Sequence, residues 1–148
     1  MSDVISIATE SMLNTISAYG MIPTVTKGSQ FQGPVAHVQI DFYGDKKALF
    51  ILEMSKEQAC SMVSSMMTCM GMPMDIKEFD TMAKSALGEM CNQISGGICT
   101  AISNTGLILD IKPPQVDERA EGLNPMRSIG FDFGSENKLI NAYFLLLE

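Results

Sequence analysis

The sequence predicts an α+β protein in which helices cover one face of a largely antiparallel sheet. Three observations lead to this fold class. Apolar residues recur at helical spacing in three segments, short apolar runs bounded by turn residues lie between them, and the same order of elements occurs twice. With 148 residues, of which 46% are hydrophobic, the chain has enough apolar material for one core and too little length for two ordinary domains. We therefore expect a single domain over residues 1–148.

The first half, roughly residues 1–55, is expected to fold as a helix, a strand and a hairpin. An amphipathic pattern runs up to Gly20, a residue type that commonly ends helices. Further on, Gly44-Asp45 separates two apolar runs, which is typical of a β-hairpin. The expected elements are a helix over 3–18, a strand over 21–26, and paired strands over 35–42 and 48–54.

The second half, roughly residues 76–148, repeats this order. Ile102-Ser103 before Gly106 matches Ile16-Ser17 before Gly20. An ancient duplication explains the match, and chance similarity between two amphipathic helices is the alternative. The expected elements are a linking helix over 56–70, a long helix over 79–105, a strand over 107–111, and strands over 127–133 and 139–147 paired around a turn at 134–137.

The segment 112–125 is expected to be the longest loop. It opens with Pro113 and Pro114, which cannot donate backbone hydrogen bonds, and it continues with the polar run 115–121. Both features argue against a strand there. Loops of this length are often functional.

Charge and hydropathy restrict the classes of partner. The formal net charge of −7 disfavours nucleic acids and anionic membranes, because both attract basic surfaces. No apolar run approaches the roughly 20 residues of a membrane-spanning helix, and the first residues lack the basic start of a signal peptide. We expect a cytoplasmic protein that binds neither membrane nor nucleic acid.

The sequence gives little support for a metal site or a self-contained hydrolase. The four cysteines have no C-x-x-C spacing, and His37, the single histidine, is remote from them. We expect free, buried or half-buried thiols at Cys60, Cys69, Cys91 and Cys99. No Ser/His/Asp set, phosphate-binding loop or dinucleotide-binding turn is present. The methionines between 62 and 74 suit either a core or an adaptable docking surface, and the core is better supported.

The long helix carries two stripes. Its apolar stripe consists of Leu87, Cys91, Ile94, Ile98 and Ala101/Ile102. About half a turn away, Ser85, Glu89, Asn92 and Gly96 form a second stripe, in which Glu89 and Asn92 lie one turn apart. A carboxylate and a carboxamide directed outward together can reach into a partner. An ordinary solvated helix face is the alternative.

The segment Ser85-Ala-Leu-Gly-Glu89-Met-Cys-Asn92, followed one strand later by Pro113-Pro114, resembles the signature of the CheX/CheC/FliY chemotaxis phosphatases. In that signature an acid or serine, a glutamate and an asparagine follow one another at this spacing. The resemblance extends to the order of elements over nearly the whole chain. It is closest to CheX, which carries one such motif where CheC carries two. Aligning Gly20 with Gly106 places Asp3 opposite Glu89 and Ser6 opposite Asn92, so the first half lacks the motif.

This resemblance implies a phosphatase that removes the aspartyl phosphate of a CheY-like response regulator. It assigns catalysis to Asn92, which would orient a water, and to Glu89, which would pair with the regulator's lysine. Supporting or partner-binding roles fall to Ser85, Gly96, Pro113 and Pro114. The protein would need no cofactor of its own, since the regulator supplies magnesium. The alternative is a non-catalytic adaptor that binds a regulator.

The apolar segment 139–147 closes the chain and raises the question of assembly. If it lies at a sheet edge, its unpaired backbone groups invite association. CheX relatives join their sheets as dimers, so the resemblance implies a homodimer with a continuous sheet. If the strand lies inside the sheet, the alternative is a CheC-like monomer.

Overall fold

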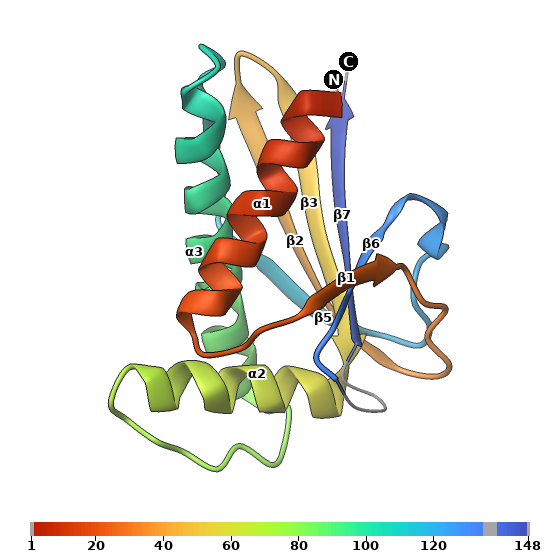
Figure 1. The fold of residues 1–148 in the computed structure, drawn as a ribbon. Helices are drawn as coiled ribbons and strands as arrows, with labels where there is room; N and C mark the ends of the chain where they lie inside the picture. The colour runs from red at the N-terminus through yellow and green to blue at the C-terminus, as the bar shows by residue number, and fades with distance from the viewer. Residues whose placement is uncertain (1, 135–138, 148) are drawn as a thin grey trace.

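A computed structural model of the chain describes residues 2–134 and 139–147. In this part of the chain, α1 and α3 lie across one face of an antiparallel sheet and α2 lies across the end of the layer (Figure 1). This arrangement confirms the predicted α+β class. The helices are α1 (Ser2–Ala18), α2 (Lys56–Cys69) and α3 (Thr81–Ser103), with a short 3₁₀ turn η1 (Pro125–Arg127). The strands are β1 (Thr24–Lys27), β2 (Val35–Gly44), β3 (Lys47–Ser55), β4 (Leu109–Ile111), β5 (Gln115–Arg119), β6 (Ile129–Asp132) and β7 (Leu139–Leu147).

The sheet has a symmetric strand order, β1-β6-β7-β3-β2-β4, with β5 also paired to β2. The long strands β3 and β7 lie side by side in the centre, and their hairpin partners β2 and β6 lie outside them. Each half of the chain contributes a helix, a short strand and a hairpin in the same order. The short strands are exchanged, because β1 pairs with β6 and β4 pairs with β2. The expected repeat and its origin by duplication stay predictions.

The hairpin β2–β3 forms where the sequence predicts it. Alternate residues of each strand face the helices and enter the core, as expected for strands with one face packed. The turn depends on Gly44, whose φ is +126° and whose Cβ, if it had one, would lie 2.6 Å from the carbonyl oxygen of Ile108. The helix-facing residues are Ala36, Val38, Ile40 and Phe42 from β2 and Ala48, Phe50, Leu52 and Met54 from β3.

The expectation of a loop over 112–125 is wrong, because Gln115–Arg119 forms β5 against Val35–Gln39 of β2. The polarity of this segment reflects an edge strand, which pairs on one side only and exposes most of its side chains to water. Pro113 and Pro114 do not end the sheet. They separate β4 from β5 at a point where the register against β2 shifts by one residue, as in a β-bulge.

Smaller differences concern strand ends. The strand expected over 21–26 begins only at Thr24, after Pro23, and the strand expected over 107–111 begins at Leu109. The strand expected over 127–133 is limited to Ile129–Asp132 because η1 precedes it. Of the expected turn at 134–137, residues 135–137 lie outside the described residues.

Strand β7 is central along one part of its length and open along the other. Residues 139–142 pair with β6 on one side, and residues 140–147 pair with β3 on the other. Over the described residues, Tyr143–Leu147 pairs with β3 alone. The condition of a sheet-edge position is therefore not met by the first four residues of β7, whereas its last five pair with β3 alone among the described residues.

The sheet face opposite the helices holds a small polar cluster. His37 Nδ1 and Glu53 Oε2 are 2.6 Å apart, and both side chains are buried. Glu53 Oε1 accepts a hydrogen bond from the backbone N–H of Leu123 at 2.8 Å. Close by, the buried Asn141 carboxamide bonds both the N–H and the carbonyl oxygen of Ser29. These bonds fix the segments around residues 29 and 123 to the sheet.

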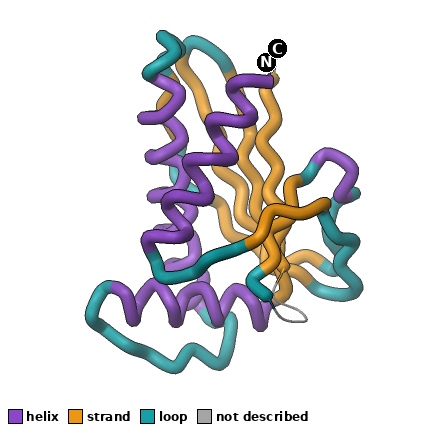
Figure 2. The backbone as a smooth tube through the Cα atoms, in the orientation of Figure 1, coloured by secondary structure: helices purple, strands orange, loops and turns teal. Residues whose placement is uncertain are grey.

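The methionines and cysteines are less uniformly buried than expected. Met62 and Met66 enter the core, whereas Met70, Met72 and Met74 are exposed. These three follow α2 in the sequence, and Figure 2 shows the long loop that joins α2 to α3. Cys60 and Cys91 are buried and Cys99 is half-buried, all as free thiols. Cys69 is exposed near the end of α2, contrary to expectation.

Candidate functional site

Helix α3 carries the candidate site, and its position is fixed at its start and along its apolar side. The Asp80 side chain caps the helix by accepting the N–H of Ala83 at 2.9 Å. The predicted apolar stripe is confirmed, since its members are fully buried against the sheet and α1, apart from the half-buried Ala101. The buried members are Leu87, Cys91, Ile94, Ile98 and Ile102.

The second predicted stripe lies on the outer side of α3. Ser85 and Glu89 are exposed, and Asn92 and Gly96 are partly exposed. Within residues 2–134 and 139–147 the Asn92 carboxamide makes no hydrogen bond, whereas Glu89 accepts one from Gln93 Nε2 at 3.4 Å. The helix thus presents an amide donor, an amide acceptor and a carboxylate to a partner within one turn.

A shallow depression of about 370 Å³ lies between the start of α3 and β5. Gly88 makes this close approach possible, because a Cβ there would lie 3.3 Å from Val116 and 3.4 Å from Pro114. Of the two predicted prolines, Pro114 therefore joins the site, and Pro113 is exposed outside the lining. The lining residues are Thr81, Lys84, Ser85, Gly88, Glu89, Pro114 and Val116.

The two adjacent glycines of α3, Gly96 and Gly97, have different surroundings. A Cβ on Gly97 would lie 3.2 Å from the hydroxyl oxygens of Ser11 and Thr15, so Gly97 allows close packing of α1 on α3. A Cβ on Gly96 would meet nothing within 4 Å. Gly96 therefore leaves an open patch one turn beyond Asn92, where a partner backbone can approach.

Sequence reasoning missed the charged residues beside the depression. Lys84 on α3 and Lys56 on α2 both pair with Glu118 on β5, each at 3.1 Å. The hydrogen bonds from Lys56 and then Lys84 lower the pKa of the Glu118 carboxyl. Lys84 is adjacent to Ser85 in the sequence, but its partner lies in the segment that was expected to be a loop. Because β5 was not predicted, nothing in the sequence indicated that Glu118 would lie beside Lys84 and Lys56.

The remaining polar groups near α3 limit the chemistry. Burial raises the pKa of the Cys91 thiol and raises that of Cys99 to about 11, so both thiols are protonated at neutral pH and are weak nucleophiles. Among the described residues, no group of three His, Cys, Asp or Glu side chains is placed to hold a metal ion. In the same residues, no helix is long and apolar enough to cross a membrane.

Comparison with known proteins identifies the family. The model of the family described as chemotaxis phosphatase CheX matches residues 36–127. No curated protein matches the chain. The chain belongs to the CheX family of chemotaxis phosphatases.

Solved structures share the fold at low sequence identity. A chemotaxis protein CheX from Desulfovibrio desulfuricans is 18% identical with a TM-score of 0.75, covering 98% of this chain and 99% of its own. A CheC-like superfamily protein from Shewanella sp. PV-4 is 16% identical with a TM-score of 0.76, covering 100% and 99%. The third, from a CheX–CheY–BeF3–Mg²⁺ complex of Borrelia burgdorferi, is 20% identical with a TM-score of 0.62, covering 95% and 97%.

Proposed function

We propose that this protein hydrolyses the aspartyl phosphate of a CheY-like response regulator in two-component signalling, with Glu89 and Asn92 as the residues that act. The observation that carries the proposal is the outward pair on α3 of a CheX-family chain, in which the Asn92 carboxamide makes no hydrogen bond to any residue that the structure describes. A structural relative was solved as a complex of CheX with CheY, beryllofluoride and magnesium, which supports a receiver domain as partner. Such a partner places the activity in the cytoplasm.

The reaction needs positioning more than covalent catalysis. In the hydrolysis, the oxygen of a water attacks phosphorus, the bond from phosphorus to the aspartyl oxygen breaks, and the aspartate leaves as a carboxylate with inorganic phosphate. The acyl phosphate is already reactive, and the regulator's own magnesium ion and lysine neutralise charge on the phosphoryl group. Asn92 supplies what is missing, because its amide can hold the water in line with the phosphorus.

The other site residues form the docking surface around Asn92. Glu89 pairs with the regulator's lysine and so sets the register of the two proteins. Ser85 and Pro114 border the depression beside Glu89, and Gly96 provides the open patch on the other side of Asn92. Pro113, which is exposed just before β5, acts by shaping the bulge that brings Pro114 to α3.

The test is to incubate the protein with phosphorylated receiver domains and follow phosphate release. Release above the regulator's own rate supports the proposal. Binding to a beryllofluoride-loaded receiver without any release would instead identify a non-catalytic adaptor. If the protein neither binds the receiver nor releases phosphate, the proposed docking surface on α3 is refuted.

Replacing Glu89 with alanine should weaken association with a beryllofluoride-loaded regulator by about 2 kcal/mol, or roughly 30-fold. The partner lysine is desolvated on docking and would lose its counter-charge. The value lies at the low end of such losses because Glu89 is exposed in the free protein. Titration calorimetry measures the difference, and Glu10→Ala, an exposed carboxylate on α1, is the matched control. Equal affinities of Glu89→Ala and the parent would show that Glu89 is only a surface charge.

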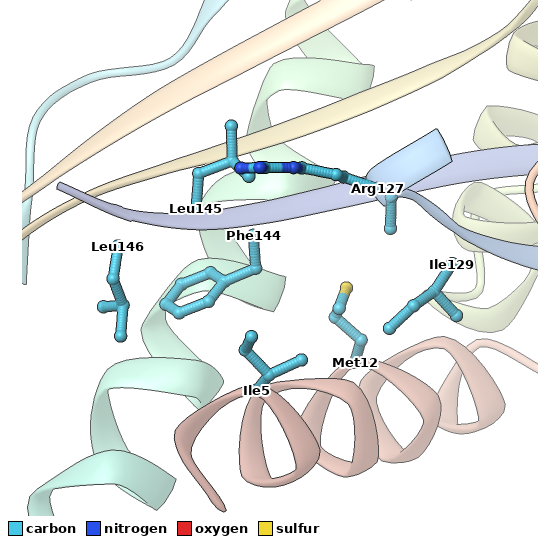
Figure 3. Close-up of a pocket in the computed structure, with 8 residues that line it drawn as sticks. Ile5, Met12, Arg127, Ile129, Phe144, Leu145 and Leu146 are labelled. Atoms are coloured by element: carbon cyan, nitrogen blue, oxygen red, sulfur yellow. The ribbon is translucent and has the colours of Figure 1, made fainter. Parts of the chain in front are cut away.

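We also propose a homodimer that joins the two sheets along the open part of β7. Among the described residues Tyr143–Leu147 pairs on one side only, and an apolar groove flanks it on the side of α1 (Figure 3). Two exposed apolar residues lie nearby: Ile5 of α1 lines this groove, and Leu147 is the last residue of β7. Antiparallel pairing of two such edges would satisfy their backbone groups and cover the groove. Helix α3 contacts β2, β4 and β5 instead, so the Glu89/Asn92 face would stay accessible.

Light scattering should therefore report about twice the 16.1 kDa chain mass at micromolar concentration. Leu147→Lys should shift the protein toward the monomer by placing charge at the paired edge. Val25→Lys changes an exposed apolar residue of β1, the strand that pairs with β6 at the end of the sheet, and serves as the control for that neighbouring edge. A parent protein of monomer mass refutes the dimer, and dissociation by Val25→Lys alone would assign the contact to β1.

A further inference from the structure

A short chain of hydrogen bonds joins the end of α1 to the candidate site. The Tyr19 hydroxyl donates to Oε1 of Gln93, and Nε2 of Gln93 donates to Oε1 of Glu89 at 3.4 Å. Gln93 follows Glu89 by one helical turn, so the second bond runs along the surface of α3. Tyr19 follows directly on the last residue of α1 and therefore ties this surface to a separate part of the structure.

Several contacts hold Tyr19, the first residue of this chain of hydrogen bonds, in place. Its backbone N–H donates to the carbonyl oxygen of Ile16 at 3.1 Å, and Gly20, with φ of +82°, turns the chain directly afterwards. The Cys69 thiol of α2 contacts the carbonyl oxygen of Ala18 at 3.2 Å, and the Tyr19 ring packs against the core. Burial, aided by the nearby Cys91 and Glu89, raises the pKa of the Tyr19 hydroxyl, which therefore stays a donor at neutral pH.

An exposed glutamate with no such support samples several rotamers, and a partner must select one of them at an entropic cost. The bond from Gln93 restricts Glu89, and the bond from Tyr19 restricts Gln93. Among the described residues only Oε1 of Glu89 is engaged, which leaves Oε2 for a cation of the partner.

We propose that Gln93 and Tyr19 are positioning residues that preorganise the Glu89 carboxylate for docking of the phosphorylated regulator. This inference rests on the proposed function for its kinetic consequence. Both residues act through Glu89, not on the reacting atoms, so they should affect the regulator concentration required and leave the hydrolytic step to Asn92.

The kinetic test compares Gln93→Ala and Tyr19→Phe in two backgrounds, the parent and Glu89→Ala, with a phosphorylated receiver as substrate. In the parent, Gln93→Ala should raise KM about three- to tenfold and Tyr19→Phe about two- to threefold, with kcat changed by less than about twofold. In the Glu89→Ala background both changes should disappear, because the residue through which they act is gone. Gln30→Ala, an exposed glutamine in the loop after β1, should leave KM unchanged.

Two kinetic outcomes would overturn the inference. An unchanged KM for Tyr19→Phe beside a raised KM for Gln93→Ala would mean that Gln93 contacts the regulator directly. KM changes that persist in the Glu89→Ala background would mean that the residues do not act through Glu89.

A measurement on the free protein separates this inference from the proposed function. The side-chain amide resonance of Gln93 in a ¹H–¹⁵N spectrum should move in both Tyr19→Phe and Glu89→Ala, because each removes one of its partners. The same resonance should stay in place in Gln30→Ala. If phosphate release is absent but the resonance moves, the proposed function fails and the hydrogen-bond chain stands. If the resonance moves in neither variant, the proposed chain of hydrogen bonds is refuted.

Discussion

Asn92→Ala should abolish measurable phosphatase activity, with a loss on the order of 10²-fold or more in rate, while folding and regulator binding stay close to the parent. Asn92 is partly exposed on α3, so its truncation opens no cavity, and alanine is the better helix former. The loss falls on the reaction because the water is no longer held in line with the phosphorus. Phosphate release at saturating regulator measures the effect.

The control for this variant is Asn104→Ala, which removes an exposed carboxamide just past the end of the same helix. It should keep the parent rate. Asn92→Asp is a second informative variant, since it retains the shape but replaces the amide donor with a charge that repels the phosphoryl group. It should be as inactive as the alanine variant. Parental turnover by Asn92→Ala would remove the proposed mechanism, whatever the binding data show.

Glu53→Ala should lower the free energy of unfolding by about 3–5 kcal/mol, because it breaks a buried pair and leaves its partners without compensation. Glu53 and His37 are 0% and 1% exposed, so water cannot replace the lost contact without entering the structure. The N–H of Leu123 would lose its acceptor as well. Urea denaturation followed by circular dichroism measures the loss.

Glu10→Ala, on the exposed surface of α1, is the matched control and should change stability by less than about 0.5 kcal/mol. Glu53→Gln keeps the side-chain volume and one acceptor for the N–H of Leu123. It should therefore lower the free energy of unfolding by less than Glu53→Ala does. The effect concerns folding rather than chemistry. At temperatures where the variant remains folded, its phosphatase rate should be close to the parent rate, and a stable but inactive Glu53→Ala would contradict the structural role.

The helices and the motif could be predicted because their signals are local. The spacing of Leu87, Cys91 and Ile94 identifies the buried side of α3, and the outward placement of Glu89 and Asn92 follows from the same periodicity. Burial in the structure confirms these positions. What the residues do there is a different question, which family membership and the proposed experiments address.

The remaining features of the site depend on pairings between distant segments. Strand β5 was missed because an edge strand exposed to water has the polarity of a loop. The contact of Pro114 with Gly88 and the pairing of Glu118 with Lys84 both follow from β5, so they were missed with it. The sequence also could not show that β6 pairs with only the first four residues of β7, because the apolar pattern of β7 does not indicate where β6 ends.

The exchanged short strands bear on how the protein folds. Thr24 of β1 pairs with Asp132, and Leu109 of β4 pairs with Gly44, so each half completes the sheet edge of the other. The outer strand of each hairpin, β2 or β6, finds its second pairing partner only in the other half of the chain. Both pairings join residues far apart in the sequence and close long loops, which is expected to slow folding. Helix α3 packs against α1 and β2, which belong to the first half, so the face that carries Glu89 and Asn92 also depends on both halves.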